Sequence, residues 1–170
     1  MGLATLILIG LGGNLESREG GDPLHTLAAA LEMLSASGIA VAARSAWYRS
    51  EPVPRSNQPW FVNAVAALAT DLPPPGLLRA MQAVETRFGR VRAARNAARS
   101  LDLDLLDYQG RLMQTPALTL PHPRLHLRRF VLVPLAEIAP LWRHPMLHAT
   151  AAELLGRLVD DHRVERLDAT

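Results

Sequence analysis

The sequence of 170 residues contains no cysteine and no lysine, and only 5% of its residues are aromatic. Without cysteine the chain can form no disulfide, no thiolate nucleophile and no cysteine-based zinc site, so its fold must be held by packing. All 18 basic residues are therefore arginine, whose planar fork suits phosphate. A compositional bias toward Ala, Leu and Arg would give the same count, so the positions of the arginines must decide between these explanations.

The sequence also lacks a long hydrophobic run. Residues 1–10 are apolar but have no basic leader and are too few to span a bilayer, which predicts neither a signal peptide nor a transmembrane helix and favours a cytoplasmic protein with no membrane partner. No linker, repeat or low-complexity segment divides the chain, and 49% apolar residues suffice for one core. We expect a single domain over residues 1–170, a monomer, with a charged tail after residue 160 that frays.

Hydrophobic periodicity predicts strands alternating with helices. Short apolar or alternating runs indicate strands at residues 4–11, 39–49, 60–70 and 100–108. Spacing of three and four indicates helices at residues 24–34, 77–88, 131–138 and 150–159. Glycines indicate turns at 12–14 and 109–110, and loops are expected at 50–59 and 90–99. The order β-α-β, β-α-β predicts an α+β, ferredoxin-like split βαβ sandwich, with helices packed on one face of an antiparallel sheet.

Two aspartates stand out in the predicted strand at 100–108. Asp102 and Asp104 are two residues apart, so their carboxylates lie on the same face of the strand, with Cα atoms roughly 7 Å apart. Like charges on one face repel unless a cation lies between them, and Mg²⁺ binds one or two carboxylates together with phosphate oxygens. A solvated strand face, or a charged edge that prevents aggregation, would show the same pattern.

Arginines cluster immediately before this acidic strand, at positions 87, 90, 92, 95 and 99. A loop of this kind could close over a triphosphate, neutralise its charge and exclude water. A solvated basic loop or a nucleic-acid patch remains an alternative.

Phe61 and Asn63 share one face of the predicted strand at 60–70. An aromatic plate beside an amide can bind a flat heteroaromatic ligand, although core packing would explain Phe61 equally well. His122 lies between two prolines, where it could reach a phosphate. Together with His126 it has a zinc-ligand spacing, but the prolines disfavour a regular helix and no third ligand is evident. The glycines at 12–13 lack the rest of a dinucleotide fingerprint.

These pieces together resemble the hydroxymethyldihydropterin pyrophosphokinase family. The resemblance is carried by collinear segments: GLGGNL (10–15), YRSEP (48–52), NQPWFVNAV (57–65), VETRFGRVR (84–92), RSLDLDLL (99–106), LTLPHPRL (118–125) and RRFVLVPLAEIAP (128–140). It implies an enzyme of folate biosynthesis that transfers pyrophosphate from Mg-ATP to the hydroxymethyl group of 6-hydroxymethyl-7,8-dihydropterin, with small-molecule substrates and no nucleic acid.

The resemblance also implies residue roles. Asp102 and Asp104 would hold two Mg²⁺ ions, and Arg90 and Arg99 would join them in catalysis. The nucleotide would be bound by Gln82, Glu85, Arg92, Arg95, Arg99, Thr119, His122 and Arg128. The pterin would be bound by Ser50, Pro52, Val53, Phe61, Asn63 and Phe130. The loops around Glu51 and Arg95 would close after both substrates bind.

The chain departs from the family pattern in places. Asn96, Ala97 and Ala98 stand where a tryptophan, glycine and proline are frequent, so an aromatic lid contact is missing. Gly13 replaces a frequent serine, and Arg129 replaces a small residue. A catalytically altered pterin- or nucleotide-binding homologue therefore remains an alternative. A basic RNA-binding module is another, although the acidic pair and the absence of an aromatic RNA-binding signature argue against it.

Overall fold

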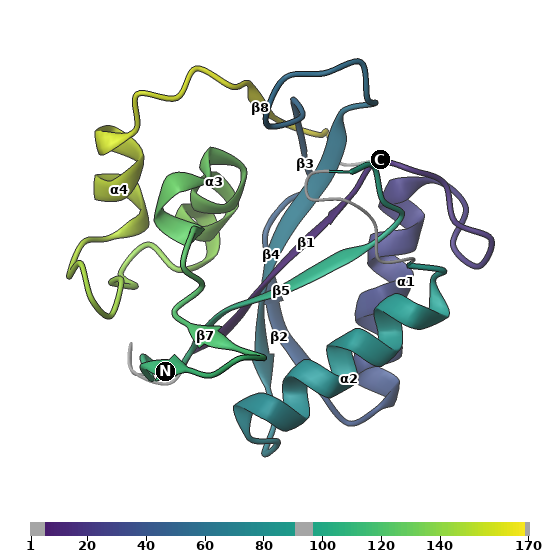
Figure 1. Cartoon of the computed structure of the whole chain (residues 1–170), viewed down its shortest axis with the longest axis horizontal. Coiled ribbons are helices and arrows are strands. Elements are labelled where there is room, and N and C mark those ends of the chain that lie inside the picture. The colour runs from purple at the N-terminus through teal and green to yellow at the C-terminus, as the bar shows by residue number, and fades with distance from the viewer. Residues whose placement is uncertain (1–5, 91–96, 169–170) are drawn as a thin grey trace.

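The protein is described by a computed structural model that covers residues 6–90 and 97–168, and its centre is one antiparallel sheet (Figure 1). The sheet runs in the order β5-β1-β4-β3-β8, and β2 also pairs with β4. Its strands are β1 (Ile7–Gly13), β2 (Ala40–Arg44), β3 (Tyr48–Ser50), β4 (Phe61–Ala69), β5 (Asp102–Tyr108) and β8 (Val164–Arg166). A small second sheet pairs β6 (Met113–Gln114) with β7 (Thr119–Leu120). The order of β5, β1 and β4 about the crossover helices confirms the predicted α+β, ferredoxin-like fold.

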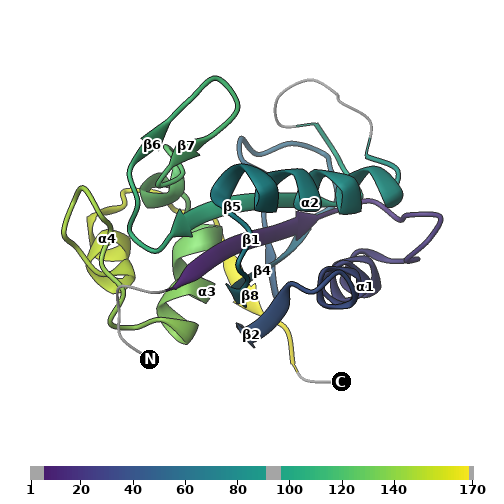
Figure 2. The same cartoon turned by 90° about the horizontal axis from the view of Figure 1, so that it is seen from below.

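Helices cover both faces of the sheet (Figure 2). One face packs against α1 (Pro23–Ala36) and α2 (Pro74–Arg87), and the other against α3 (Arg129–Ile138) and α4 (Ala151–Arg157). The expectation of helices on one face only is therefore wrong. The physical reason is that the strands are apolar on both sides: Ile7 and Ile9 belong to the first core, whereas Leu8 belongs to the second.

The helix ends follow the sequence signals closely. Asp22 caps α1, its side chain accepting a hydrogen bond from the His25 backbone N–H at 3.0 Å. α2 begins at Pro74, three residues before the start at residue 77 that the hydrophobic periodicity predicts. The fixed φ of proline suits the first turn of a helix, which explains the earlier start. A short 3₁₀ turn, Leu125–Leu127, leads into α3. Within residues 6–90 and 97–168, none of the helices has the length and apolar character needed to cross a membrane.

The strand predicted at 39–49 is wrong as a single element, because the structure splits it into β2 and β3. Ser45 lies between them and is buried, and its hydroxyl accepts a hydrogen bond from the Val65 backbone N–H at 3.1 Å. The register against β4 also shifts between Val41 and Ala43. A side chain that bonds to the neighbouring backbone in this way replaces a ladder bond and interrupts the strand.

Gly12 and Gly13 were expected in a turn, but they are the last residues of β1. Close approach of other chain segments explains them. A Cβ atom on Gly13 would lie 2.4 Å from the Ser100 carbonyl oxygen, and one on Gly12 would lie 3.2 Å from Asn63 Oδ1. The turn predicted at Gln109-Gly110 is confirmed, and both residues have positive φ.

The charged tail does not fray as expected over the residues that the structure describes. Its residues Val164–Arg166 form β8 and pair antiparallel with β3, Tyr48 lying opposite Arg166. Arg49 Nε donates to Glu165 Oε2 at 2.7 Å across this pair. Alternating opposite charges can stabilise an edge strand without apolar periodicity, which is why the hydrophobic pattern missed it.

Candidate active site

A cavity opens on the face of the sheet covered by α3, at the end where β1 carries glycines in place of bulky side chains. Its floor is formed by β1, β4 and β5, and its walls by the segment after β3, the start of α3 and the C-terminal tail. The lining includes nine residues predicted from the sequence: Ser50, Val53, Phe61, Asn63, Arg99, Asp102, Asp104, Arg128 and Phe130. It also includes residues that the sequence analysis did not assign to the site: Gly10, Gly12, Arg124, Leu127 and Asp160.

Asp102 and Asp104 lie on the cavity side of β5, as their spacing predicted, while Leu103 points into the opposite core. Their side chains are 21% and 32% exposed. Burial raises the pKa of Asp102, and repulsion from Asp104 raises it further, while Arg99 and Arg90 oppose this shift. The carboxylate pair therefore favours neighbouring cations.

Arginines supply that positive charge in the described structure. Asp102 Oδ1 forms an ion pair with Arg90 Nη1 at 2.7 Å, and Asp102 Oδ2 accepts a hydrogen bond from Arg99 Nη1 at 2.8 Å. Asp104 accepts from Arg128 Nη1 at 3.1 Å. These two groups of ion pairs, one at Asp102 and one at Asp104, form a charged network at the cavity, with donors suited to phosphate and acceptors suited to a hard cation.

Glu85 supports this network from the other side of β5. Its side chain is buried, and Oε1 accepts a hydrogen bond from the Leu103 backbone N–H at 2.7 Å and another from Arg90. Burial raises the pKa of Glu85 to about 7. This position links the last residues of α2 to the acidic strand, so Glu85 orients Arg90 rather than lining the cavity.

The opposite end of the cavity combines an amide with aromatic rings. Asn63 is only 3% exposed, and its Nδ2 donates to Ser50 Oγ at 2.6 Å. Phe61 lies two residues earlier on β4, and Phe130 faces the same cavity from α3, with the Arg128 guanidinium 5.7 Å from its ring centroid. An amide of fixed orientation between aromatic surfaces suits a flat heterocycle with polar edges.

Asn14 holds the two ends of the site together, and sequence reasoning missed it. Its Oδ1 accepts from the Arg99 backbone N–H at 2.9 Å, and its Nδ2 donates to the Pro59 carbonyl at 3.0 Å. Asn14 is buried at the end of β1. An asparagine directly after a glycine pair was the available signal, because such a side chain can bond several backbone segments at once.

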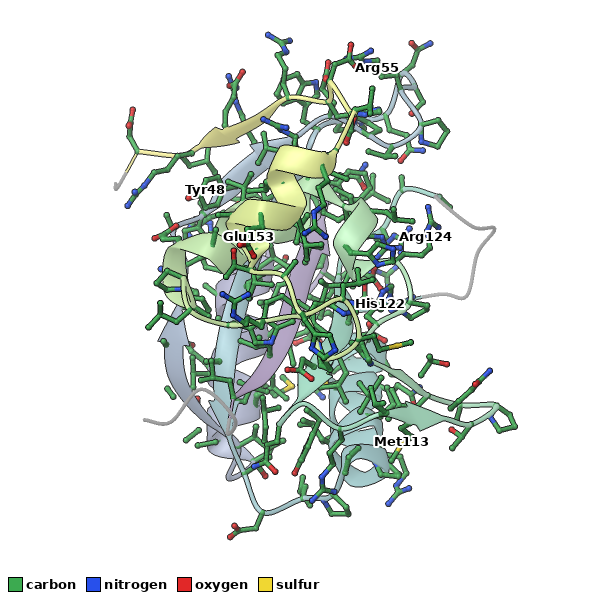
Figure 3. The ribbon with its side chains drawn as sticks, turned by 90° about the vertical axis from the view of Figure 1, so that its left-hand side faces the viewer. Tyr48, Arg55, Met113, His122, Arg124 and Glu153 are labelled. Atoms are coloured by element: carbon green, nitrogen blue, oxygen red, sulfur yellow. The ribbon has the colours of Figure 1, made fainter. Side chains whose placement is uncertain are left out.

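His122 lies beside the acidic strand, and Figure 3 shows it near Arg124 at the edge of the site. Its Nδ1 accepts from the Arg124 backbone N–H at 3.1 Å, which leaves the proton on Nε2, 3.9 Å from Asp104 Oδ2. Burial and the nearby Arg128 lower the pKa of His122 to about 4. His122 is therefore neutral at pH 7 and can donate one hydrogen bond. No group of three potential metal ligands in the described part of the chain includes His122 or His126.

The remaining predicted residues of the described structure are not part of the cavity lining. Gln82 is exposed on α2, Thr119 is half-buried on β7, and Pro52 is buried beside the lining residue Val53. Arg92, Arg95 and Asn96 fall outside the described residues. The Ala97 carbonyl, from the unusual lid sequence, accepts from Arg99 Nε at 3.2 Å.

Comparison with known proteins agrees with this geometry. The sequence model of the 7,8-dihydro-6-hydroxymethylpterin-pyrophosphokinase family matches residues 8–140. The 2-amino-4-hydroxy-6-hydroxymethyldihydropteridine pyrophosphokinase of Methylorubrum extorquens is 46% identical over 137 residues, covering 80% of this chain and 84% of the relative. The protein of the same name from Synechocystis is 42% identical over 152 residues, covering 89% of this chain and 75% of the relative.

Solved structures support the fold. The HPPK-DHPS triple mutant of Plasmodium falciparum superposes with a TM-score of 0.68 at 13% identity. The superposition covers 89% of this chain but only 44% of that longer chain.

Proposed function

Because this chain belongs to the 7,8-dihydro-6-hydroxymethylpterin-pyrophosphokinase family, we propose that its cavity transfers a diphosphate group from Mg-ATP to the hydroxymethyl oxygen of 6-hydroxymethyl-7,8-dihydropterin. The products are AMP and the pterin diphosphate, as folate biosynthesis requires. The observation that carries this assignment is the composition of one cavity: an acidic pair with arginines at one end and an amide with aromatic rings at the other.

The pterin end is assigned to residues of β3, β4 and α3. Phe61 and Phe130 supply the ring faces between which the heterocycle stacks. Asn63, held by Ser50, presents the rest of its amide to the polar edge of the ring. The remaining wall is assigned to Ser50, Pro52 and Val53.

Asp102 and Asp104 are the residues that would hold magnesium. Their oxygen donors fit this ion, and a cation beside the pair would favour the ionised form of Asp102, whose pKa is raised by burial and by the neighbouring Asp104. We assign two ions to this pair. Bound magnesium would neutralise the phosphates and polarise the phosphorus that is attacked.

The arginines act on the nucleotide. Arg90, Arg99 and Arg128 pair with the aspartates, so two Mg²⁺ ions and a fully ionised ATP, whose charges cancel, can exchange partners with them without a net change of buried charge. The guanidinium groups then face the phosphates and stabilise charge on the leaving AMP oxygen. Further nucleotide contacts are assigned to Gln82, Arg92, Arg95, Thr119 and His122, and Glu85 is assigned an indirect part through Arg90.

Transfer itself needs no covalent enzyme intermediate. The pterin oxygen attacks the β-phosphorus of ATP, the bond from that phosphorus to the α-phosphate oxygen breaks, and AMP leaves. Residues at the two ends of the cavity contribute by aligning the reacting atoms and excluding water. We assign this reaction to a monomer acting in the cytoplasm, where ATP is available.

The decisive experiment follows AMP and pterin diphosphate after mixing the protein with hydroxymethyldihydropterin, ATP and Mg²⁺. We expect equal amounts of the two products and no reaction with EDTA. Binding of pterin or ATP without AMP release would instead identify a catalytically altered homologue, for which the Asn96 to Ala98 lid sequence is the specific reason. Tight RNA binding without AMP release would favour the basic binding module.

A further inference from the structure

The C-terminal strap, which we define as residues 159–166, runs from α4 across the molecule to the edge of the sheet. Figure 1 shows this yellow segment leaving α4, passing the end of α3 and joining β3 as β8. It lies beyond the residues matched by the family model, which end at 140.

The strap is bonded to the substrate loop, residues 51–60, which joins β3 to β4 and lines the pterin end of the cavity. Glu51 and Arg163 make the closest connection. The Arg163 backbone N–H donates to Glu51 Oε2 at 2.8 Å, and the Glu51 backbone N–H donates to the Arg163 carbonyl at 3.2 Å. The Glu51 side chain is only 14% exposed, and the bond from the Arg163 backbone lowers the pKa of Glu51.

A second set of contacts joins the strap to the middle and the end of the substrate loop. Arg55 Nη2 lies 3.3 Å from Glu51 Oε2 and 3.2 Å from Asp161 Oδ1, so its guanidinium bridges loop and strap. Figure 3 shows Arg55 at the tip of the molecule beside the strap. At the end of the loop, the Arg163 guanidinium lies 4.8 Å from the ring centroid of Trp60, the residue before Phe61.

The strap also contributes directly to the cavity wall through Asp160. The His162 backbone N–H donates to Asp160 Oδ1 at 2.9 Å. Hydrogen bonds from His162 and the charge of Arg129 lower the pKa of Asp160 against the effect of burial.

We propose that the strap holds the substrate loop in the position that binds the pterin. In this proposal Glu51 is a positioning residue, because it fixes the loop through the Arg163 backbone. The inference rests on the proposed function and extends it to residues beyond the matched core. The loop lines the end of the cavity that holds Asn63 and Phe61, whereas the acidic pair lies on β5. Loss of the connection must therefore weaken pterin binding and leave ATP binding largely unchanged.

The test uses the full chain and measures KM for each substrate together with kcat. We expect Glu51→Ala to raise the pterin KM about tenfold, the effect of losing roughly one charge-assisted hydrogen bond, while the ATP KM stays within twofold. Glu51→Gln keeps an oxygen acceptor for the Arg163 N–H and should restore most of the pterin affinity.

Arg163 supplies the matched pair of variants. Arg163→Pro removes the backbone N–H and should raise the pterin KM as Glu51→Ala does, whereas Arg163→Ala keeps the N–H and should have a smaller effect. If Glu51 acts through this N–H, adding Glu51→Ala to Arg163→Pro causes little further change. Pterin affinity in the presence of a non-hydrolysable ATP analogue, measured by calorimetry, gives the same comparison without turnover.

Three results would overturn the inference: an unchanged pterin KM in Glu51→Ala, equal increases in both KM values, or effects of Glu51→Ala and Arg163→Pro that simply add. Circular dichroism on each variant separates unfolding from loss of loop position. Failure of the wild-type protein to release AMP would instead contradict the proposed function, so the two failures are distinguishable.

Discussion

The two halves of one sheet face differ in a way that explains the site. At one half, Leu8, Val65 and Leu106 pack against α3, and Trp142 belongs to the same apolar core. At the other half, the same strands carry Gly12 and Asn63 with the acidic pair on β5, and the same helix covers a cavity. Both halves are built from the same strands and the same helix. The volume and polarity of their side chains therefore determine which half is a packed core and which half is a cavity.

Replacing the acidic pair should give the largest effect. Asp102→Asn and Asp104→Asn each remove a proposed magnesium ligand, so we expect AMP release to fall about 10³-fold or more, equivalent to roughly 4 kcal/mol of transition-state stabilisation. Steady-state AMP release at saturating substrates measures it.

Asp107 is the matched control on the same strand. It lies at the core half of the face, where Oδ2 accepts from Trp142 Nε1 at 2.9 Å. Asp107→Asn should lower stability and leave the activity of the folded enzyme close to wild type. Equal activity losses at Asp102 and Asp107 would show that the site and the core are not separate in function.

A substitution in the core half should have the opposite effect, a loss of stability with little change in activity. Leu8 is completely buried between β4, β5 and α3. Leu8→Ala should lower the free energy of unfolding by about 4 kcal/mol, because it removes buried apolar volume and leaves a cavity. Urea unfolding followed by circular dichroism measures this, and kcat per folded molecule should change less than twofold. A large change in kcat at unchanged stability would contradict the separation of this sheet face into a site half and a core half.

The buried carboxyl of Glu85 should give a smaller effect that depends on pH. Burial raises its pKa from 4.5 to about 7, so between these values the folded protein keeps a proton that the unfolded chain releases. Stability contributed by this group is complete below pH 4.5 and is lost as the pH rises to 7, by about 3 kcal/mol. Glu85→Gln cannot ionise and should lose less stability over this range.

Thermal unfolding with EDTA and without nucleotide, at pH 4.5 to 7.5, measures the difference in slope. Glu32→Gln replaces an exposed glutamate of α1 and should follow the wild-type curve. Parallel curves for Glu85→Gln and the wild type would show that Arg90 keeps the carboxyl ionised throughout.

The sequence predicts local features of both halves and misses those that depend on contacts distant in the chain. The spacing of Asp102 and Asp104 fixes their common face because a strand has a period of two. The burial of Glu85 depends on the Leu103 backbone, 18 residues away. The strap pairs with β3, which lies more than a hundred residues earlier in the chain, and charged side chains join the two segments. No local apolar pattern therefore predicts this pairing. The roles assigned to individual site residues remain predictions.

Substitutions of the β1 glycines should give the smallest effect and test whether the site half is shaped around the Asn63 amide. A Cβ on Gly12 would lie 3.2 Å from Asn63 Oδ1, whereas one on Gly10 would make ordinary contact with Leu106 at 3.6 Å. Gly12→Ala should therefore displace the amide by a few tenths of an ångström and raise the pterin KM about fivefold, or roughly 1 kcal/mol, since hydrogen bonds depend steeply on geometry. Gly10 also lines the cavity, but its Cβ would meet Leu106 and not the amide, so Gly10→Ala should stay within twofold. Equal effects of the two substitutions would mean that the glycines only provide space, and a larger effect of Gly12→Ala would mean that this half of the sheet is shaped around the orientation of one amide.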